Sequence, residues 1–340
     1  MTTIDAVETL LTRLVAIDSV TPWLVPTGAG EAQVARFIAD WLADLPLEVA
    51  LEEAAPGRPN VVARLRGTGG GPALLLNAHH DTVGYDNWRD RALVAERRDD
   101  RLIGLGTADD KAGVAACLLA LRELCAGPRL RGDVVLVTVA DEEGASIGTA
   151  HHVATHTADA CIVVEPNDSR RVYVQSQGFG WIDITVHGRA AHGSAPEAGI
   201  DAVVRMAEVV RSLHRRDVEV YGAGPVPFNG RTVFHTSTIR GGTDYATYPA
   251  SAVLGIEIGT QPGERLADRV REIEATFEEV RRVFPDLRAE VDVRLERFPF
   301  VAEGHERLLA CADAAAMEVH GAPLEQIGFN AWADAALVQA

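Results

Sequence analysis

Hydrophobic positions along the chain follow two different spacings. Apolar residues recur every three to four positions in 4–17 and 31–45, which predicts amphipathic helices. Short apolar, β-branched runs at 73–76, 134–140 and 160–164 predict strands buried on both faces. Further strands are expected near 47–52, 60–66 and 101–103, and further helices at 112–124 and after Gly148. Because helices alternate with strands, this half predicts an α/β fold with a mostly parallel sheet covered by helices.

From about Val172 the pattern changes to pairs of alternating strands separated by helices. Strands are expected at 172–177, 180–187, 233–239, 252–258 and 288–296, and helices at 200–215, 264–283 and 305–319. Antiparallel strands and helices in this order are typical of an α+β sandwich. We therefore predict an inserted domain at 172–296 and a first domain made of 1–171 and 297–340.

Three acidic residues, Asp141, Glu142 and Glu143, directly follow the predicted central strand at 134–140. Three carboxylates repel one another, so holding them together favours a cation among them. Ligands of open α/β sheets also bind at the carboxyl ends of the strands. A solvated acidic turn after a core strand is the alternative.

Other predicted strand ends carry matching groups. His79 and Asp81 follow the strand at 73–76, Asp109 follows the strand at 101–103, and Glu165 follows the strand at 160–164. One imidazole with several carboxylates suits zinc or a similar first-row divalent ion, and two ions if one carboxylate bridges them. His79 and Asp81 are two apart, so on an extended segment Asp81 can orient the imidazole.

Composition and charge exclude some classes of binding partner and indicate where the protein is located. The 340 residues carry a formal net charge of -17, which argues against nucleic acid or an anionic membrane as partner. No apolar run is long enough for a membrane span, and the N-terminal residues lack a secretory signal pattern. Four scattered cysteines are typical of reduced residues in a cytoplasmic protein. These features predict a cytoplasmic location.

Six motifs resemble one family in the right order. They are Leu74 to Val83 (LLLNAHHDTV), Gly104 to Lys111 (GLGTADDK), Asp141 to Thr149 (DEEGASIGT), Glu165-Pro166, Gly188 to Ser194 (GRAAHGS), and Gly241-Gly242-Thr243 with Pro262-Gly263. The family comprises metal-dependent amidohydrolases and peptidases such as acetylornithine deacetylase, succinyl-diaminopimelate desuccinylase, aminoacylase and glutamate carboxypeptidase. The resemblance implies a zinc-exopeptidase-like catalytic domain and an inserted lid domain through which two chains form a homodimer.

The resemblance also implies a role for each candidate residue. His79 and Glu165 would hold one metal ion, Asp109 would bridge, and Glu143 would belong to a second ion. Zinc is the expected metal, with cobalt or manganese as alternatives. Glu142 would be the general base, Asp81 would support catalysis beside His79, and His192 would stabilise the oxyanion from the partner subunit. Substrate contacts are expected from Arg240, Gly241, Gly242 and Asp334.

The sequence departs from the family pattern at three points. The last metal ligand of the family, a histidine, is expected beyond Ala340, so either the second metal site is incomplete or the chain is shortened. The arginine that binds the substrate α-carboxylate falls at Gly259, and an asparagine with the same task falls at Ala246. Because both residues that would hold the α-carboxylate are missing, we expect either a substrate with a different group at that place or an active site that is no longer required to catalyse a reaction.

Two functions follow from the sequence. The first is a metal-dependent hydrolase that cleaves an amide bond of an N-acyl amino acid or small peptide, with Glu142 as general base. The second is a non-catalytic relative that serves as a binding or assembly subunit. The intact run of Asp141, Glu142 and Glu143 favours the enzyme, because a binding module needs no base.

Overall fold

The fold was described from a computed structural model, which covers residues 3–86, 88 and 91–339. The chain divides into two compact units. The first comprises residues 1–169, 305–311 and 333–340, and the second comprises residues 170–304 and 312–332. Each unit has its own hydrophobic core.

A five-stranded mixed sheet forms the centre of the first unit. Its strand order is β1-β2-β6-β3-β7, in which β6, β3 and β7 run parallel and β1 and β2 pair antiparallel. The strands are β1 (Glu48–Ala55), β2 (Arg58–Leu65), β3 (Leu74–His79), β6 (Val134–Val139) and β7 (Ala160–Val163), and a separate two-stranded sheet consists of β4 (Glu96–Arg98) and β5 (Arg101–Ile103).

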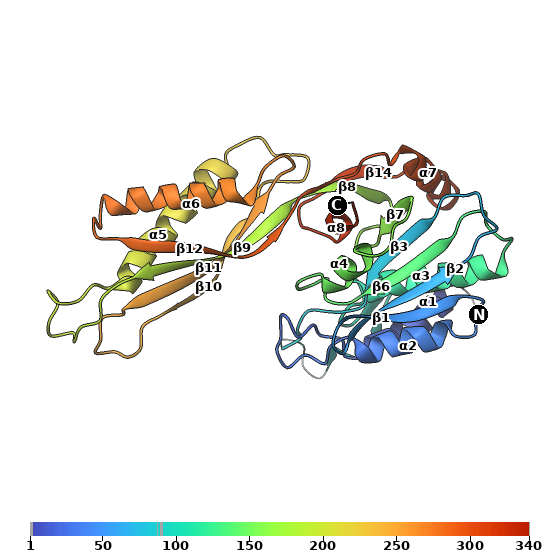
Figure 1. The fold of residues 1–340 in the computed structure, drawn as a ribbon, viewed down its shortest axis with the longest axis horizontal. Helices are drawn as coiled ribbons and strands as arrows, with labels where there is room; N and C mark the ends of the chain where they lie inside the picture. The colour runs from blue at the N-terminus through green and yellow to red at the C-terminus, as the bar shows by residue number, and fades with distance from the viewer. Residues whose placement is uncertain (1–2, 87, 89–90, 340) are drawn as a thin grey trace. The chain divides into compact units, whose positions relative to one another are not determined.

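Helices cover both faces of this sheet because the central strand is apolar on both sides. Along β6, Val134 and Leu136 pack into one core, and Val137 and Val139 pack into another on the opposite face. The first core is completed by α1 (Thr3–Val15), α2 (Ala32–Leu42) and α3 (Lys111–Ala126). Figure 1 shows α4 (Ile147–Val153) and α8 (Ala335–Gln339) over the other face.

A four-stranded antiparallel sheet forms the larger part of the second unit. Its order is β10-β11-β9-β12, and α5 and α6 pack on one face over a core that includes Ile182, Ile184 and Met206 (Figure 1). The elements of this unit are β8 (Arg171–Ser176), β9 (Gly178–His187), α5 (Ala202–Arg216), a π-helical turn (Asp217–Tyr221), β10 (Phe234–Gly241), β11 (Ser251–Thr260), α6 (Leu266–Arg281), β12 (Arg288–Arg297), β13 (Phe300–Val301) and β14 (Glu325–Phe329). Helix α7 (Glu306–His320) begins in the first unit and ends in the second.

The predicted α/β class with an α+β second part is confirmed, with one refinement. The first sheet is mixed, because β2 joins β6 antiparallel and brings β1 with it. A third sheet of order β13-β8-β14 belongs to the second unit, so residues 312–332 cluster there. In the part of the chain that the structure describes, no helix is long and apolar enough to cross a membrane.

Candidate metal and catalytic centre

The carboxyl ends of three parallel strands assemble the candidate site. β3 lies between β6 and β7 and ends at His79. Glu142 and Glu143 follow β6, and Glu165 follows β7, so the strand order delivers these groups to one edge of the sheet. Asp109 comes from the turn before α3, where its peptide bond to Asp110 is cis.

His79 is the centre of this arrangement. Its Nε2 atom lies 2.8 Å from Asp109 Oδ1, and its imidazole is buried. Ligand atoms of His79, Asp109 and Glu165 all lie within 4.8 Å of one another. The Nδ1 atom faces Asp81 Oδ1 at 3.4 Å, which is long for a hydrogen bond. Nε2 is therefore the nitrogen turned toward Asp109, and Nδ1 is turned toward Asp81.

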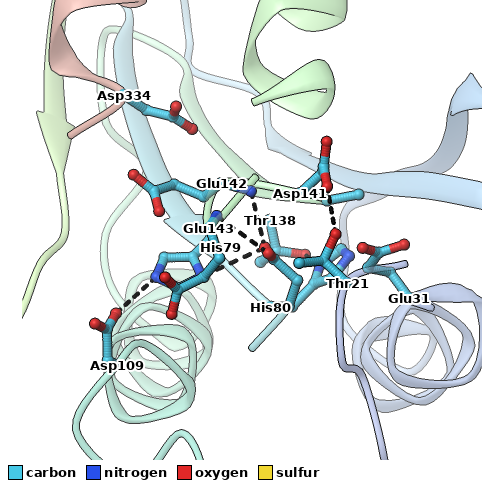
Figure 2. A network of polar contacts seen from close by, with 12 residues as sticks. Thr21, Glu31, His79, His80, Asp109, Thr138, Asp141, Glu142, Glu143 and Asp334 are labelled. Carbon is cyan, nitrogen blue, oxygen red and sulfur yellow. Dashed lines mark hydrogen bonds and ion pairs between the residues drawn. The ribbon is translucent and has the colours of Figure 1, made fainter. Parts of the chain in front are cut away.

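Asp81 connects the histidine to the acidic loop. Its two carboxylate oxygens accept hydrogen bonds from the backbone N–H groups of Glu142, at 3.0 Å, and Glu143, at 3.2 Å. Figure 2 shows the carboxylates of Glu142, Glu143 and Asp109 gathered around the His79 ring, with the contact between His79 and Asp109 dashed. Asp81 thus fixes the start of both glutamates relative to the imidazole.

Burial and crowding change the acidity of these carboxyl groups. Burial, together with the neighbouring carboxylates, raises the pKa of Glu142 and of Glu165 well above its ordinary value, and His79 opposes this. The same causes raise the pKa of Glu143 to about 7. For His79, burial opposes the charged form, but Asp109 and Asp81 together hold its pKa well above the usual value. The carboxylates therefore repel one another, and a cation among them would relieve this repulsion.

These residues fit a divalent metal ion. The donor set is one imidazole nitrogen and carboxylate oxygens, which suits zinc and similar first-row ions. Three of the donors already converge, and the half-buried carboxyl groups of Glu143 and Glu165 have raised pKa values, so an ion would replace their protons. His79, Asp109 and Glu165 could hold such an ion, with Glu143 beside them.

A buried polar network holds the acidic loop from behind. Asp141 has a positive φ of 67°, and its carboxylate accepts hydrogen bonds from the Thr21 hydroxyl, from Arg58 Nη2 at 2.8 Å and from the Ala145 N–H at 3.1 Å. Arg58 also pairs with Glu31 (Figure 2 includes Glu31 and Thr21). Sequence reasoning missed this network, because Thr21, Glu31 and Arg58 lie in unrelated segments. Of the residues in this network, the sequence pointed only to Asp141, as part of the acidic run 141–143.

Of the remaining predicted residues, Asp334 lies beside Glu142 (Figure 2), and the others belong to the second unit. Asp334 is buried in the first unit, accepts a hydrogen bond from Thr149, and has its pKa raised to about 6, mainly by burial. His192 is exposed in the second unit and contacts Ser194. Arg240, Gly241 and Gly242 belong to the second unit too, at and after the end of β10.

The acidity of the site predicts how stability depends on pH without metal. Between pH 6.5 and 8 the unfolded chain has already lost its carboxyl protons, whereas folded Glu143 loses its proton only as the pH rises through about 7, and His79 likewise keeps its proton longer when folded. We expect the free energy of unfolding in chelator to fall by about 2 kcal/mol over this window. Urea unfolding of the metal-free protein at pH 6.5 and at pH 8 measures this change in the free energy of unfolding.

Two other titrating groups limit this pH range, and the variant Glu143→Gln serves as the control. Below pH 6.5, buried His80, with a pKa of about 3, opposes the trend; above pH 8, Lys111, with a pKa of about 8, does so. Glu143→Gln removes one titrating group and should make the fall shallower, and added zinc should restore stability at pH 8. A flat profile for the metal-free wild-type protein would contradict the predicted acidity.

Comparisons with known proteins agree with this chemistry. The profile of Peptidase family M20/M25/M40 matches residues 75–340. Acetylornithine deacetylase of Aliivibrio fischeri is 31% identical over 265 residues, covering 73% of this chain and 68% of that protein. N-formyl-4-amino-5-aminomethyl-2-methylpyrimidine deformylase of Halalkalibacterium halodurans is 29% identical, covering 77% and 66%.

Solved structures share the fold. A tripeptidase from Staphylococcus aureus superposes with a TM-score of 0.79 at 22% identity, and human carnosine dipeptidase 1 with 0.80 at 17%. Each match covers 98% of this chain and 87% of the other. The fold and the site together define a metal-dependent hydrolase of amide bonds that requires a divalent ion.

The chain belongs to peptidase family M20/M25/M40. This confirms the family that the sequence motifs resemble and the predicted class of enzyme. The competing prediction, a non-catalytic binding or assembly subunit, is not favoured by these relatives.

Proposed function

We propose that His79 and Glu165 bind one metal ion, that Asp109 bridges, and that Glu143 serves a second ion. The observation that carries this proposal is the convergence of donor atoms of His79, Asp109 and Glu165 within 4.8 Å. Zinc is the proposed metal because imidazole and carboxylate donors suit it, with cobalt or manganese as alternatives. A bound ion of this kind polarises the scissile carbonyl and lowers the pKa of water.

Glu142 is the proposed general base and acid. Its carboxyl group is buried beside His79, and burial raises its pKa, so it can hold a proton taken from water and then pass it to the leaving amine. Its backbone N–H is fixed by Asp81 at 3.0 Å, which limits the positions open to the side chain. Asp81 is a positioning residue for both Glu142 and His79.

His192 is proposed to donate a hydrogen bond to the developing oxyanion. Its Nδ1 atom accepts from the Ser194 N–H at 3.2 Å, so in the neutral ring the proton resides on Nε2. An exposed Nε2–H is the donor that this role needs. The family resemblance supplies the partner subunit as the source of this histidine, which makes the proposed active form a homodimer.

The proposed substrate is an N-acyl amino acid or small peptide that is not held by an arginine at position 259. A side chain at Gly259 would start 2.5 Å from Gln177 Oε1 and 3.1 Å from the Val233 nitrogen, so this position has no room for one. Arg240 is exposed on β10 and is the proposed replacement cation, with Gly241, Gly242 and Asp334 as the other proposed substrate contacts.

Assembly and location are proposed on separate grounds. β10 is the edge strand of its sheet and carries exposed Ile239, which supports pairing with a second copy through the second unit. Light scattering on the purified protein tests the homodimer. A cytoplasmic location is proposed from the four free cysteines.

The activity test is a screen of amide substrates with defined metals. Metal-free protein should be inactive on N-acyl amino acids and dipeptides, and zinc, cobalt or manganese should restore turnover. Each N-acetyl amino acid is paired with its C-terminal amide, and we expect kcat/KM to favour the free carboxylate, because Arg240 supplies the cation that position 259 lacks. Equal kcat/KM within each pair would show that Arg240 does not bind the carboxylate. Absence of turnover with every metal and substrate would contradict the proposed function.

A further inference from the structure

A second cluster of metal-ligand side chains lies outside the candidate active site. It consists of Glu52 on β1, His152 on α4 and His156 just beyond that helix, and their ligand atoms lie within 4.8 Å of one another. β1 is the edge strand of the first sheet, and none of the three residues belongs to the centre around His79. We propose that this cluster is a second binding site for a first-row divalent ion such as zinc.

The hydrogen bonds of His156 leave one nitrogen facing a carboxylate. Its Nδ1 atom lies 3.2 Å from the His152 carbonyl oxygen and 3.0 Å from the Thr155 hydroxyl oxygen, and the tautomer with the proton on Nδ1 donates to them. The lone pair of the neutral ring is then on Nε2, which lies 3.5 Å from Glu52 Oε1. In this tautomer two acceptors face each other, an arrangement that a metal ion between them would stabilise.

The second imidazole faces the same carboxylate. His152 Nδ1 lies 3.1 Å from Glu52 Oε2. The two rings stack with centroids 4.4 Å apart and planes inclined by 5°, so the half-exposed His156 ring must turn for both nitrogen lone pairs to meet at one ion. Burial lowers the pKa of His152, which keeps this ring neutral and able to bind a metal. Donor atoms bound tetrahedrally to zinc are separated by about 3.4 Å, a value set by bond lengths of ~2.0–2.2 Å. The 3.1 and 3.5 Å separations are close to this value.

The burial of the three side chains matches a site that is open on one side. His152 is 3% exposed and Glu52 is 19% exposed, whereas His156 is 47% exposed. An ion can therefore enter beside His156 and complete its coordination with water. Once bound, it would join the edge strand β1 to the end of α4, the helix that follows the loop of Glu142 and Glu143.

Zinc stoichiometry tests the proposal. Wild-type protein, His156→Ala and Glu52→Gln are dialysed against the same micromolar zinc buffer, and bound zinc per chain is measured by atomic emission. We expect each variant to carry one zinc fewer than the wild type. His151→Ala changes an exposed histidine of the same helix and should bind as much zinc as the wild type.

Two further measurements separate site loss from misfolding and from a protonated ion pair. Circular dichroism in chelator should give equal melting temperatures for the wild type and His156→Ala within about 2 °C, because the changed side chain is half exposed. Zinc should then raise the melting temperature more in the wild type. NMR of ¹⁵N-histidine should show His152 Nδ1 and His156 Nε2 shifting on zinc addition. Equal zinc content in the wild type and both variants would overturn the proposal and leave a proton between Glu52 and His156.

Discussion

Replacing Glu142 by glutamine should lower kcat by about 10³-fold without reducing the metal content of the protein. Glutamine keeps the size of the side chain but cannot take a proton from water, and a positioned general base contributes roughly 10²–10⁴-fold. The buried carboxyl beside His79 has its pKa raised by burial, so it is suited to this transfer. Steady-state kinetics on an active amide substrate and zinc analysis of the same preparation measure both expectations.

The control for this variant is Glu123→Gln, a change from glutamate to glutamine on the exposed side of α3. It should leave kcat and KM within twofold of the wild type. The assignment of Glu142 fails if Glu142→Gln keeps more than a tenth of the wild-type kcat. Loss of zinc together with activity would instead make Glu142 a ligand.

Replacing Arg58 by methionine should destabilise the protein by about 3–5 kcal/mol. The change leaves Glu31 and Asp141, both fully buried, without the cation that they share. Removing one partner from a buried ion pair has this cost because the remaining charge is left uncompensated. Urea unfolding monitored by circular dichroism measures the change in the free energy of unfolding.

The matched control is Arg64→Met, which changes another arginine of strand β2. Arg64 pairs with Asp133, but its side chain is 43% exposed, and exposed pairs contribute about 0–1 kcal/mol. The double variant Arg58→Met with Glu31→Gln should recover part of the loss, because it removes one of the two stranded charges. Equal destabilisation by Arg58→Met and Arg64→Met would show that the buried network does not support the acidic loop.

Sequence reasoning predicted the local elements and the strand ends best. Apolar runs such as 134–140 identify buried strands directly, and parallel order brings the residues after β3, β6 and β7 to one edge. The approach of His79 and Glu165 follows from that order, whereas Asp109 comes from the turn before α3. The antiparallel attachment of β1 and β2 was not predicted, because the direction of a strand depends on its partner and not on its own apolar pattern.

Contacts between distant segments could not be predicted from a single sequence. Arg58 accompanies Glu31 and Asp141 only after folding, and nothing in the pattern around Arg58 distinguishes it from Arg64 on the same strand. The pairing of Glu52 with His152 and His156 likewise depends on β1 lying beside α4. The sequence shows the two histidines four positions apart, but it does not indicate their carboxylate partner.

The packing at Gly259 limits how the specificity of this enzyme can change. Gln177, which fills the space beside this glycine, donates hydrogen bonds to the Asn229 and Arg231 carbonyl oxygens and accepts one from the Val233 N–H. Arginine at 259 would displace that glutamine and release the segment it anchors. A guanidinium at this position therefore requires Gln177 to move or to be replaced, which removes the support that it gives to residues 229–233.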